Sequence, residues 1–477
     1  MLARQIEKPA FAPGALTGLA IGLCLLVVAA QSHAQTAGEV EFSRGVGFAQ
    51  TPGQTPRTLG KGLPLREGDR LTTSDGASAI IKLEDGTRMT VRPNSELVLT
   101  QYHFKENAPD NSMLMQLVRG GFRAVTGLIS KNAPNAAKVQ TNTATIGIRG
   151  TDFDARVCAR ECGAESAKVE EKARPNAVLA SAKVVNSRGE VNATDASGTR
   201  RRVVDGGSIY PGDLVETGAG TNAVLAFRDE SKVTLGSTTR FRVDNFVYDE
   251  KNAGEGRFLV SLLKGSVRAL TGLIGKANTR NVGYATATAT IGIRGSGGDI
   301  VCTGACAGEP GAPGTGLTVY AWLDSFTVSP CAAGSQPLTQ GGSCNATALQ
   351  VLQAGQGLYI PPTGPMQFIA NQPTIDAPRP DGVVVPPKLF SGDNVPENSE
   401  GLFVFVRDGH IEIATANDIL QLGKGEAGFA GLGGETRRPN TVPRFLDFDK
   451  IPLPNSKNPL LVSVLNESGV KTGGQCK

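Results

Sequence analysis

The sequence predicts an all-β protein made of two tandem β-domains, of β-sandwich or short β-solenoid type, followed by C-terminal β-hairpin units. Three observations predict this class. The same glycine-punctuated segment occurs twice, about 144 residues apart, and so constant an offset indicates a duplicated domain. Apolar and polar residues alternate with period two over short runs. The 477 residues include 60 glycines and 28 prolines, which favours many short strands and turns over long helices.

The duplication is clearest in a hexapeptide that closes each copy. It reads Thr-Ile-Gly-Ile-Arg-Gly at residues 145–150 and again at residues 290–295. Its glycines are expected to allow backbone approaches that a side chain would block. Its arginine either has a structural role, bonding carbonyl groups or the aspartate of a Gly-Asp turn, or recognises a carboxylate ligand; we favour the structural role. The hexapeptide positions of interest are Gly147, Arg149, Gly150, Gly292, Arg294 and Gly295.

Strand patterns inside the two copies correspond. Alternation at Ala79, Ile81 and Leu83, followed by an Asp-Gly turn at residues 85–86, predicts a hairpin in the first copy. The second copy repeats this scheme from residue 223. We therefore place the two β-domains at residues 40–162 and 180–306.

Residues 1–34 have the layout of a secretory signal peptide. Arg4 and Lys8 give a basic start, residues 15–30 are apolar, and a Ser-His-Ala cleavage site ends at Ala34. A permanent transmembrane helix needs about 20 apolar residues, so we expect cleavage after Ala34. The mature protein would then have no membrane span and would be periplasmic or secreted.

Shorter units follow the second domain. Residues 315–360 and 401–430 each predict a β-hairpin unit, and the two echo each other, with Phe326 in the first answered by Ile411 in the second. Residues 361–400 lie between them and hold nine prolines, which predicts a semi-rigid linker that keeps the last hairpin away from the domains. Residues 431–477 are expected to form a poorly ordered tail.

Seven cysteines remain after the expected cleavage, and six of them fall in near pairs. In an oxidising compartment this spacing favours local disulfides. A four-sulfur zinc site is the alternative that the spacing also permits. The remaining Cys476 is either a free thiol or an intermolecular partner. The disulfide candidates are Cys158, Cys162, Cys302, Cys306, Cys331 and Cys344.

Residues that catalysis commonly needs are scarce. The formal net charge of +4 is too small and too dispersed to predict nucleic-acid binding. His103 and His410 are far apart, and no nucleophile elbow, HExxH motif or phosphate loop is present. Asp152 and Asp154 are candidate paired carboxylates, but an exposed turn is the favoured interpretation, and the lone Trp322 is a candidate contact residue. We therefore expect a non-enzymatic protein without catalytic residues, metal ligands or cofactor.

Three further motifs recur in both copies: a Gly-Asp turn that begins at Gly68 and Gly212, an Ala-x-Ile/Leu-x-Leu/Phe-x-Asp strand that begins at Ala79 and Ala223, and a glycine before a strand at Gly120 and Gly265. Together with the closing hexapeptide, these motifs resemble the FecR domain, a bacterial periplasmic module. The second copy departs from the family pattern after the hexapeptide, where residues 296–299 read Ser-Gly-Gly-Asp, and this departure is expected to loosen the closing strand.

The resemblance implies a role at the cell envelope. The best-known members resemble iron-dicitrate sensors, with an anti-sigma segment, a membrane helix and a periplasmic domain; others are plain exported proteins. Only residues 1–14 precede the apolar run, which is shorter than an anti-sigma domain needs. We therefore expect an exported binding or scaffold protein whose partner is an envelope protein, peptidoglycan or polysaccharide. Two alternatives stay open: a periplasmic component that relays receptor occupancy to a separate membrane partner, and an envelope carbohydrate-binding protein or enzyme.

Overall fold

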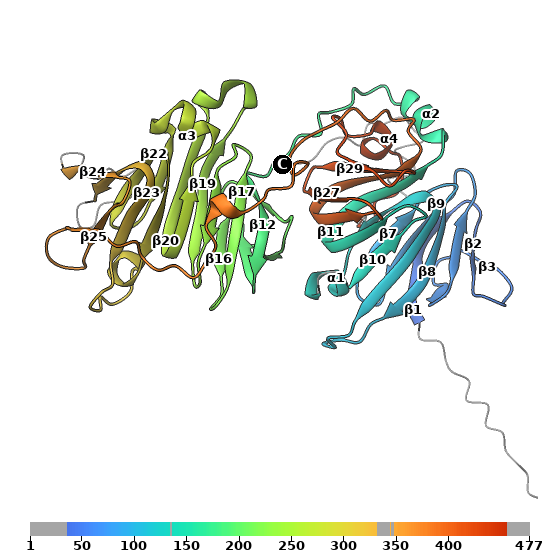
Figure 1. Ribbon diagram of the computed structural model, residues 1–477. Helices are drawn as coiled ribbons and strands as arrows, with labels where there is room; N and C mark the ends of the chain where they lie inside the picture. The colour runs from blue at the N-terminus through green and yellow to red at the C-terminus, as the bar shows by residue number, and fades with distance from the viewer. Residues whose placement is uncertain (1–35, 134–135, 332–343, 345–347, 456–477) are drawn as a thin grey trace, which may run out of the picture. The chain divides into compact units, whose positions relative to one another are not determined.

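The computed structural model describes residues 36–133, 136–331, 344 and 348–455 (Figure 1). The signal peptide expected at residues 1–34 lies outside these ranges, as do residues 456–477. Within the described ranges, no helix has the length and apolar character needed to cross a membrane.

The described residues form two sheets of 15 strands each, which we call module 1 and module 2. Four short α-helices accompany them: α1 (Leu128–Asn132), α2 (Glu161–Ala167), α3 (Leu273–Ala277) and α4 (Arg444–Asp447). Module 1 contains β1 (Thr36–Arg44), β2 (Gly47–Gln50), β3 (Arg57–Thr58), β4 (Pro64–Arg66), β5 (Arg70–Thr73), β6 (Ser78–Leu83), β7 (Arg88–Val91), β8 (Glu96–His103), β9 (Ser112–Val125), β10 (Ala137–Gln140), β11 (Thr145–Cys158), β27 (Gly401–Ala414), β28 (Ile419–Gly423), β29 (Ala427–Gly431) and β30 (Thr436–Arg437). Module 2 contains β12 (Ala182–Arg188), β13 (Val191–Thr194), β14 (Arg200–Val203), β15 (Ser208–Ile209), β16 (Leu214–Thr217), β17 (Asn222–Phe227), β18 (Lys232–Leu235), β19 (Arg240–Val247), β20 (Arg257–Leu270), β21 (Val282–Ala285), β22 (Ala289–Cys302), β23 (Leu317–Pro330), β24 (Gln350–Gln353), β25 (Gln356–Ile360) and β26 (Gln367–Ile369).

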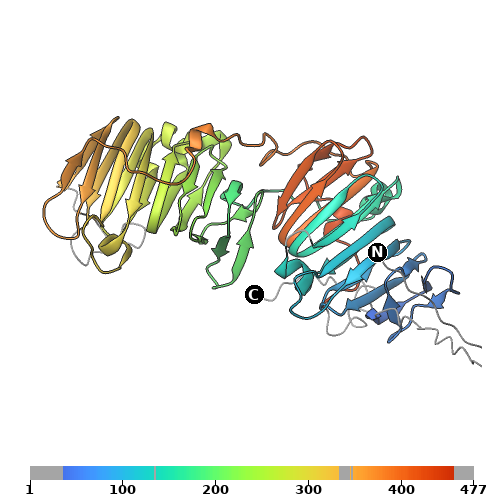
Figure 2. The ribbon, with the colours of Figure 1, turned by 60° about the horizontal axis from the view of Figure 1, so that its bottom comes forward.

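The two modules share one strand order. Module 1 runs β3-β2-β5-β8-β9-β10-β11-β27-β29-β30, and module 2 runs β14-β13-β16-β19-β20-β21-β22-β23-β25-β26. Each strand from β1 to β11 corresponds to the strand eleven places later, and β27 to β30 correspond to β23 to β26. In Figure 2 the yellow and orange strands of module 2 continue one sheet in this order. The predicted all-β class and the predicted duplication are both confirmed.

The C-terminal hairpins belong to these sheets and are not separate units. β23 pairs with β22 over most of its length, and β27 pairs with β11 in the same way; Figure 1 shows red β27 beside teal β11. The chain leaves module 1 after β11, builds all of module 2, and returns to complete the first sheet. Residues 361–400 therefore do not keep the last hairpin away from the domains. The proline content predicted a stiff linker, which is a local property. It could not predict that β27 pairs with β11, because the two strands lie far apart in the sequence.

The expected poorly ordered tail is also corrected over residues 431–455. Val442, Phe445 and Leu446 are buried in an apolar cluster against Phe403 and Phe405 of β27. The sequence pattern of this stretch is polar and rich in proline, so it did not predict that its few apolar side chains pack against β27.

A long bent strand lets each sheet curl over its own core. The first half of β9 pairs with β8 and β10, and its second half pairs with β7 and β11. Gly120 lies where the partners change, with φ +70°, and a Cβ there would lie 2.3 Å from Ser95 Oγ. Gly265 of β20 repeats this, with φ +92° and a Cβ position 2.4 Å from Thr239 Oγ1. Only glycine fits both the torsion and the space.

Candidate functional site

The hexapeptide arginine of module 1 has structural partners. Arg149 Nη2 lies 3.6 Å from Glu412 Oε2, and its Nη1 donates to the carbonyl oxygen of Asp205 at 3.4 Å. Burial lowers the pKa of Arg149, and the nearby Glu412 carboxylate opposes this. The side chain of Arg294 lies outside the described part of the chain.

The aspartate of the Gly-Asp turn, which was the other expected partner, is held by different arginines. Asp69 accepts from Arg57 Nη2 at 2.5 Å, and Asp213 in module 2 pairs with Arg201. Both aspartates are almost fully buried. The Gly-Asp turn is therefore closed within its own end of the module and does not involve the hexapeptide.

The last glycine of each hexapeptide is needed for its torsion. Gly150 and Gly295 have φ +61° and +68° at the bulge that separates the two halves of the closing strand. A Cβ on Gly295 would meet nothing within 4 Å, so close approach is not its role. Close approach applies to Gly292, where a Cβ would lie 2.5 Å from Thr327 Oγ1.

The structure contains the three predicted disulfides. They join Cys158 to Cys162, Cys302 to Cys306, and Cys331 to Cys344. Among the described residues, no three His, Cys, Asp or Glu side chains gather in a way that would hold a metal ion. Cys476 lies outside the described ranges.

Asp154 differs most from its sequence-based interpretation as part of an exposed turn. It lies in the middle of β11 and is fully buried. Arg92 Nη2 lies 3.2 Å from one of its oxygens, and Arg407 Nε donates to the other at 2.7 Å. Asp152, two positions earlier, pairs with Arg123 at 3.2 Å. Each carboxylate is saturated by arginine, so the two do not form an acid–base pair.

Strand alternation explains where these charges lie. Phe153 and Ala155 of β11 point into the main core of module 1, so Asp152, Asp154 and Arg156 point the other way. The same alternation turns Thr90 and Arg92 at β7, Arg123 of β9, and Phe403, Phe405 and Arg407 of β27 toward that side. We call this surface of β7, β9, β11 and β27 the outer face of module 1.

Residues 442–452, which we call cover segment 1, lie on this outer face. Asp449 Oδ2 lies 2.5 Å from Arg92 Nη2, and the Asp449 side chain is only 10% exposed. Burial raises the pKa of Asp449 to about 6; Arg92 opposes this rise and the nearby Asp154 adds to it. Three further contacts run from module side chains to backbone oxygens of the segment: Arg407 Nη2 to Leu446 O at 2.8 Å, Thr90 Oγ1 to Pro452 O at 2.7 Å, and Arg92 Nη1 to Phe445 O at 3.4 Å. The segment's own side chains also form ion pairs, Arg444 with Glu397 at 2.8 Å and Asp447 with Arg174 at 2.5 Å.

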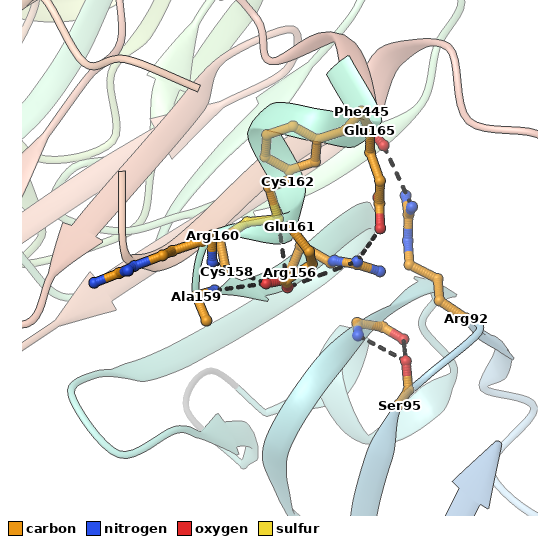
Figure 3. The surroundings of a disulfide bond; sticks show 11 residues. Arg92, Ser95, Arg156, Cys158, Ala159, Arg160, Glu161, Cys162, Glu165 and Phe445 are labelled. Atoms are coloured by element: carbon orange, nitrogen blue, oxygen red, sulfur yellow. Dashed lines mark hydrogen bonds and ion pairs between the residues drawn. A yellow bond between two sulfur atoms is a disulfide. The ribbon is translucent and has the colours of Figure 1, made fainter. Parts of the chain in front are cut away.

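An apolar cluster holds the other end of cover segment 1. Phe445 packs edge-on against Phe403, with ring centroids 5.3 Å apart. The Cys158–Cys162 disulfide belongs to the same buried cluster. Figure 3 shows Phe445 beside this disulfide, and Arg156 reaching to Glu165 on α2, where Arg156 Nη2 donates at 2.5 Å. The disulfide-closed loop thus forms one wall of the site.

Module 2 has a buried carboxylate at the equivalent position. Asp154 lies opposite Phe405 in the β11–β27 pair, and Asp299 lies opposite Tyr320 in the β22–β23 pair. Phe405 and Tyr320 therefore correspond, and so do the residues two positions later, Arg407 and Trp322. Asp299 accepts from Trp322 Nε1 at 3.1 Å and from Gln372 Nε2 at 2.7 Å. Burial raises the pKa of Asp299, and the hydrogen bonds from Gln372 and Trp322 and the positive charge of Arg268 oppose this rise.

Residues 372–383, cover segment 2, lie on the outer face of module 2. Arg268 Nη2 donates to Ile375 O at 3.2 Å, and Lys232 Nζ donates to Val383 O at 2.6 Å. Arg379 stacks on the Trp322 ring, with its Cζ 4.1 Å from the centroid. Both modules therefore hold a stretch of their own chain on the same face, through its backbone carbonyls.

A signal for this site is present in the sequence, although the strand and motif patterns did not single it out. Asp154 and Asp299 both stand shortly after the hexapeptide of their copy. The expected loosening of the closing strand in the second copy is not observed, because β22 spans 14 residues as β11 does. Within the Ser-Gly-Gly-Asp sequence of β22, Asp299 is retained as the equivalent of Asp154, and it accepts hydrogen bonds on the outer face of module 2.

The site contains no assembled reactive group among the described residues. His410 Nε2 lies 2.8 Å from Gln421 Oε1, and burial lowers the pKa of His410 to about 3, which keeps the ring neutral. His103 lies on the surface, 3.4 Å from Asp110. Both oxygens of Asp154 and of Asp299 have hydrogen-bond donors from neighbouring side chains.

Comparison with known proteins gives one clear match. The family model described as FecR protein matches residues 69–174 and 213–304. The chain is also similar to two crystal structures, at 1.65 and 2.50 Å resolution, of a candidate anti-sigma factor from Parabacteroides distasonis. Identity is 10% in both cases, coverage is 54% and 53% of this chain and 72% and 71% of the other, and the TM-score is 0.14, too low to carry an argument. No curated protein matches the sequence significantly.

Proposed function

We propose that this chain, which belongs to the FecR domain family through its two FecR segments, is an exported, non-enzymatic protein that binds or scaffolds components of the cell envelope. One observation carries the proposal: each module presents an outer face that holds a polypeptide segment around a buried carboxylate. A face whose side chains donate to the backbone carbonyls of a bound segment suits binding without turnover.

The disulfides support an exported location. Disulfides form and persist in oxidising compartments such as the bacterial periplasm and are rare in the cytosol. Two of the three bridges, Cys158–Cys162 and Cys302–Cys306, lie at equivalent places in the two modules. A disulfide that recurs at the same position of both modules fits a protein that matures outside the cytoplasm.

Cell fractionation and a binding assay test this proposal. The native host is fractionated, and the N-terminal residue of the mature protein is determined. We expect a periplasmic or secreted protein that begins at Gln35. The purified protein is then incubated with peptidoglycan sacculi and with inner and outer membrane fractions. Arg70→Ala serves as a surface control, because this side chain is 51% exposed and β5 is not part of the outer face.

We expect saturable retention by one envelope fraction, equal for the natural protein and the control variant, without release of any soluble product. A cytoplasmic location would contradict the proposal, and so would failure to bind any of the three fractions.

A further inference from the structure

We propose that the outer face of module 1 is a binding site for a polypeptide segment of a partner protein, and that cover segment 1 occupies this site as an internal ligand. The inference rests on the proposed binding function and names the class of partner. The segment that fits has two adjacent apolar residues followed three positions later by a carboxylate. In cover segment 1 these are Phe445, Leu446 and Asp449.

The first argument is that the outer face contacts main chain. Arg407 and Thr90 donate to the carbonyl oxygens of Leu446 and Pro452 at 2.8 and 2.7 Å. Every peptide segment offers such oxygens, whatever its sequence. Cover segment 1 contains no strand, so it is not joined to the sheet by a ladder of hydrogen bonds. One backbone bond, from Val442 N to Arg174 O at 3.0 Å, and two ion pairs, Arg444–Glu397 and Asp447–Arg174, hold its first half. The contacts to the outer face itself come from side-chain donors, which a second segment can use equally well.

The second argument is charge. The outer face places Arg92, Arg123 and Arg407 around Asp152 and Asp154, which leaves one positive charge in excess. Asp449 supplies the missing negative charge at 2.5 Å from Arg92, whose side chain is only 3% exposed. Without Asp449, Arg92 and Arg407 would share the single carboxylate of Asp154, so an acidic side chain at this point gives Arg92 an acceptor of its own.

The third argument is the apolar wall. Phe445 and Leu446 are almost fully buried, in a cluster that includes Phe403, Phe405 and the Cys158–Cys162 disulfide. This cluster is separate from the main core of module 1. A segment without two adjacent apolar side chains would leave this wall exposed to water, which gives the site its selectivity.

Module 2 repeats the arrangement with different side chains. Its outer face also donates to carbonyl oxygens, from Arg268 to Ile375 and from Lys232 to Val383. Its buried carboxylate, however, receives an amide from Gln372 instead of facing a second carboxylate. Both copies thus hold a polypeptide on the same face, and each has its own side-chain preference. Cover segment 2 therefore supplies a matched control sequence.

The test uses a fluorescent synthetic peptide of residues 441–455 and the full chain. In the opened variant, Phe445→Ser with Leu446→Ser, the internal ligand loses its apolar anchor. An attached ligand competes at an effective concentration of about millimolar, so opening the site is expected to tighten peptide binding by about tenfold or more. Adding Arg92→Gln to the opened variant is expected to abolish the gain, and a peptide of residues 370–384 is expected not to compete.

A second measurement uses the unmodified chain and does not depend on the folding of a variant. Hydrogen–deuterium exchange of residues 442–452 is followed with and without excess isotope-labelled peptide of residues 441–455. We expect faster exchange of the chain's own segment when the peptide displaces it. Unchanged exchange at saturating peptide would overturn the inference, as would a folded opened variant that does not bind. If the natural protein still binds an envelope fraction in that case, the proposed function stands and only this inference fails.

Discussion

Replacing the two equivalent buried carboxylates by asparagine should have unequal costs. Asp154 accepts from two guanidinium groups, one of them on Arg92, which is itself buried. Removing one partner of a buried ion pair costs roughly 3–5 kcal/mol. Asp449 remains beside Arg92 and offsets part of this cost. We therefore expect Asp154→Asn to lower the free energy of unfolding of module 1 by about 3 kcal/mol.

Asp299 has neutral donors at its two shortest contacts, Trp322 and Gln372. A neutral hydrogen bond contributes about 1 kcal/mol. Asparagine keeps a carbonyl oxygen for Trp322, and the Gln372 amide can turn to accept from the new NH₂ group. Burial already raises the pKa of Asp299, so its negative charge is costly in the folded state. We expect Asp299→Asn to cost about 1 kcal/mol.

The lone tryptophan allows the unfolding of the two modules to be followed separately in one experiment. Trp322 is the single tryptophan of the chain and contacts Asp299, so its fluorescence reports module 2, whereas far-ultraviolet circular dichroism reports both modules. For units of this size, 1 kcal/mol shifts the Tm by roughly 2–4 °C. Asp154→Asn should lower one dichroism transition by roughly 6–12 °C and leave the fluorescence transition unchanged. A shift for Asp299→Asn equal to or larger than that for Asp154→Asn would refute the reasoning.

Three further predictions concern backbone, charge and disulfide. Gly120→Ala should lower the Tm of module 1 much more than Gly53→Ala does. Both glycines have positive φ, but a Cβ would lie 2.3 Å from Ser95 Oγ at Gly120 and would meet nothing within 4 Å at Gly53. Equal losses of Tm would contradict this prediction. The folded pKa of Asp449, about 6, lies above the ordinary value of about 3.9, so its contribution to stability is full below pH 4 and is lost as pH rises through 6. The Tm of the natural protein minus that of Asp449→Asn should therefore fall between pH 4 and pH 7, and a rise would contradict the assigned direction. Replacing Cys158 and Cys162 by serine should cost about 2 kcal/mol and speed hydrogen exchange in cover segment 1, whereas loss of the equivalent bridge of module 2 should leave that exchange unchanged.

Local sequence patterns were sufficient to predict the strands, the duplication and the local disulfides. Alternation at Ala79, Ile81 and Leu83, the twin hexapeptides and the near-paired cysteines are local patterns, and the structure contains the corresponding strands, modules and disulfides. The echo between the two hairpin units likewise corresponds to the match between β23 and β27. These features depend on period, spacing and turn chemistry, which neighbouring residues specify.

The side chains and segments that lie on the outer faces could not be predicted from local patterns, because they depend on tertiary packing. Asp154 appears in the sequence as one of two carboxylates near a strand end, and its burial depends on Arg92, Arg407 and a segment far downstream in the chain. The return of β27 to β11 and the packing of Phe445 likewise depend on distant partners. A carboxylate or an apolar pair has the same local pattern whether it is solvated or covered. The difference is the desolvation and pairing energy that the partner surface supplies, and that surface exists only once the chain has folded.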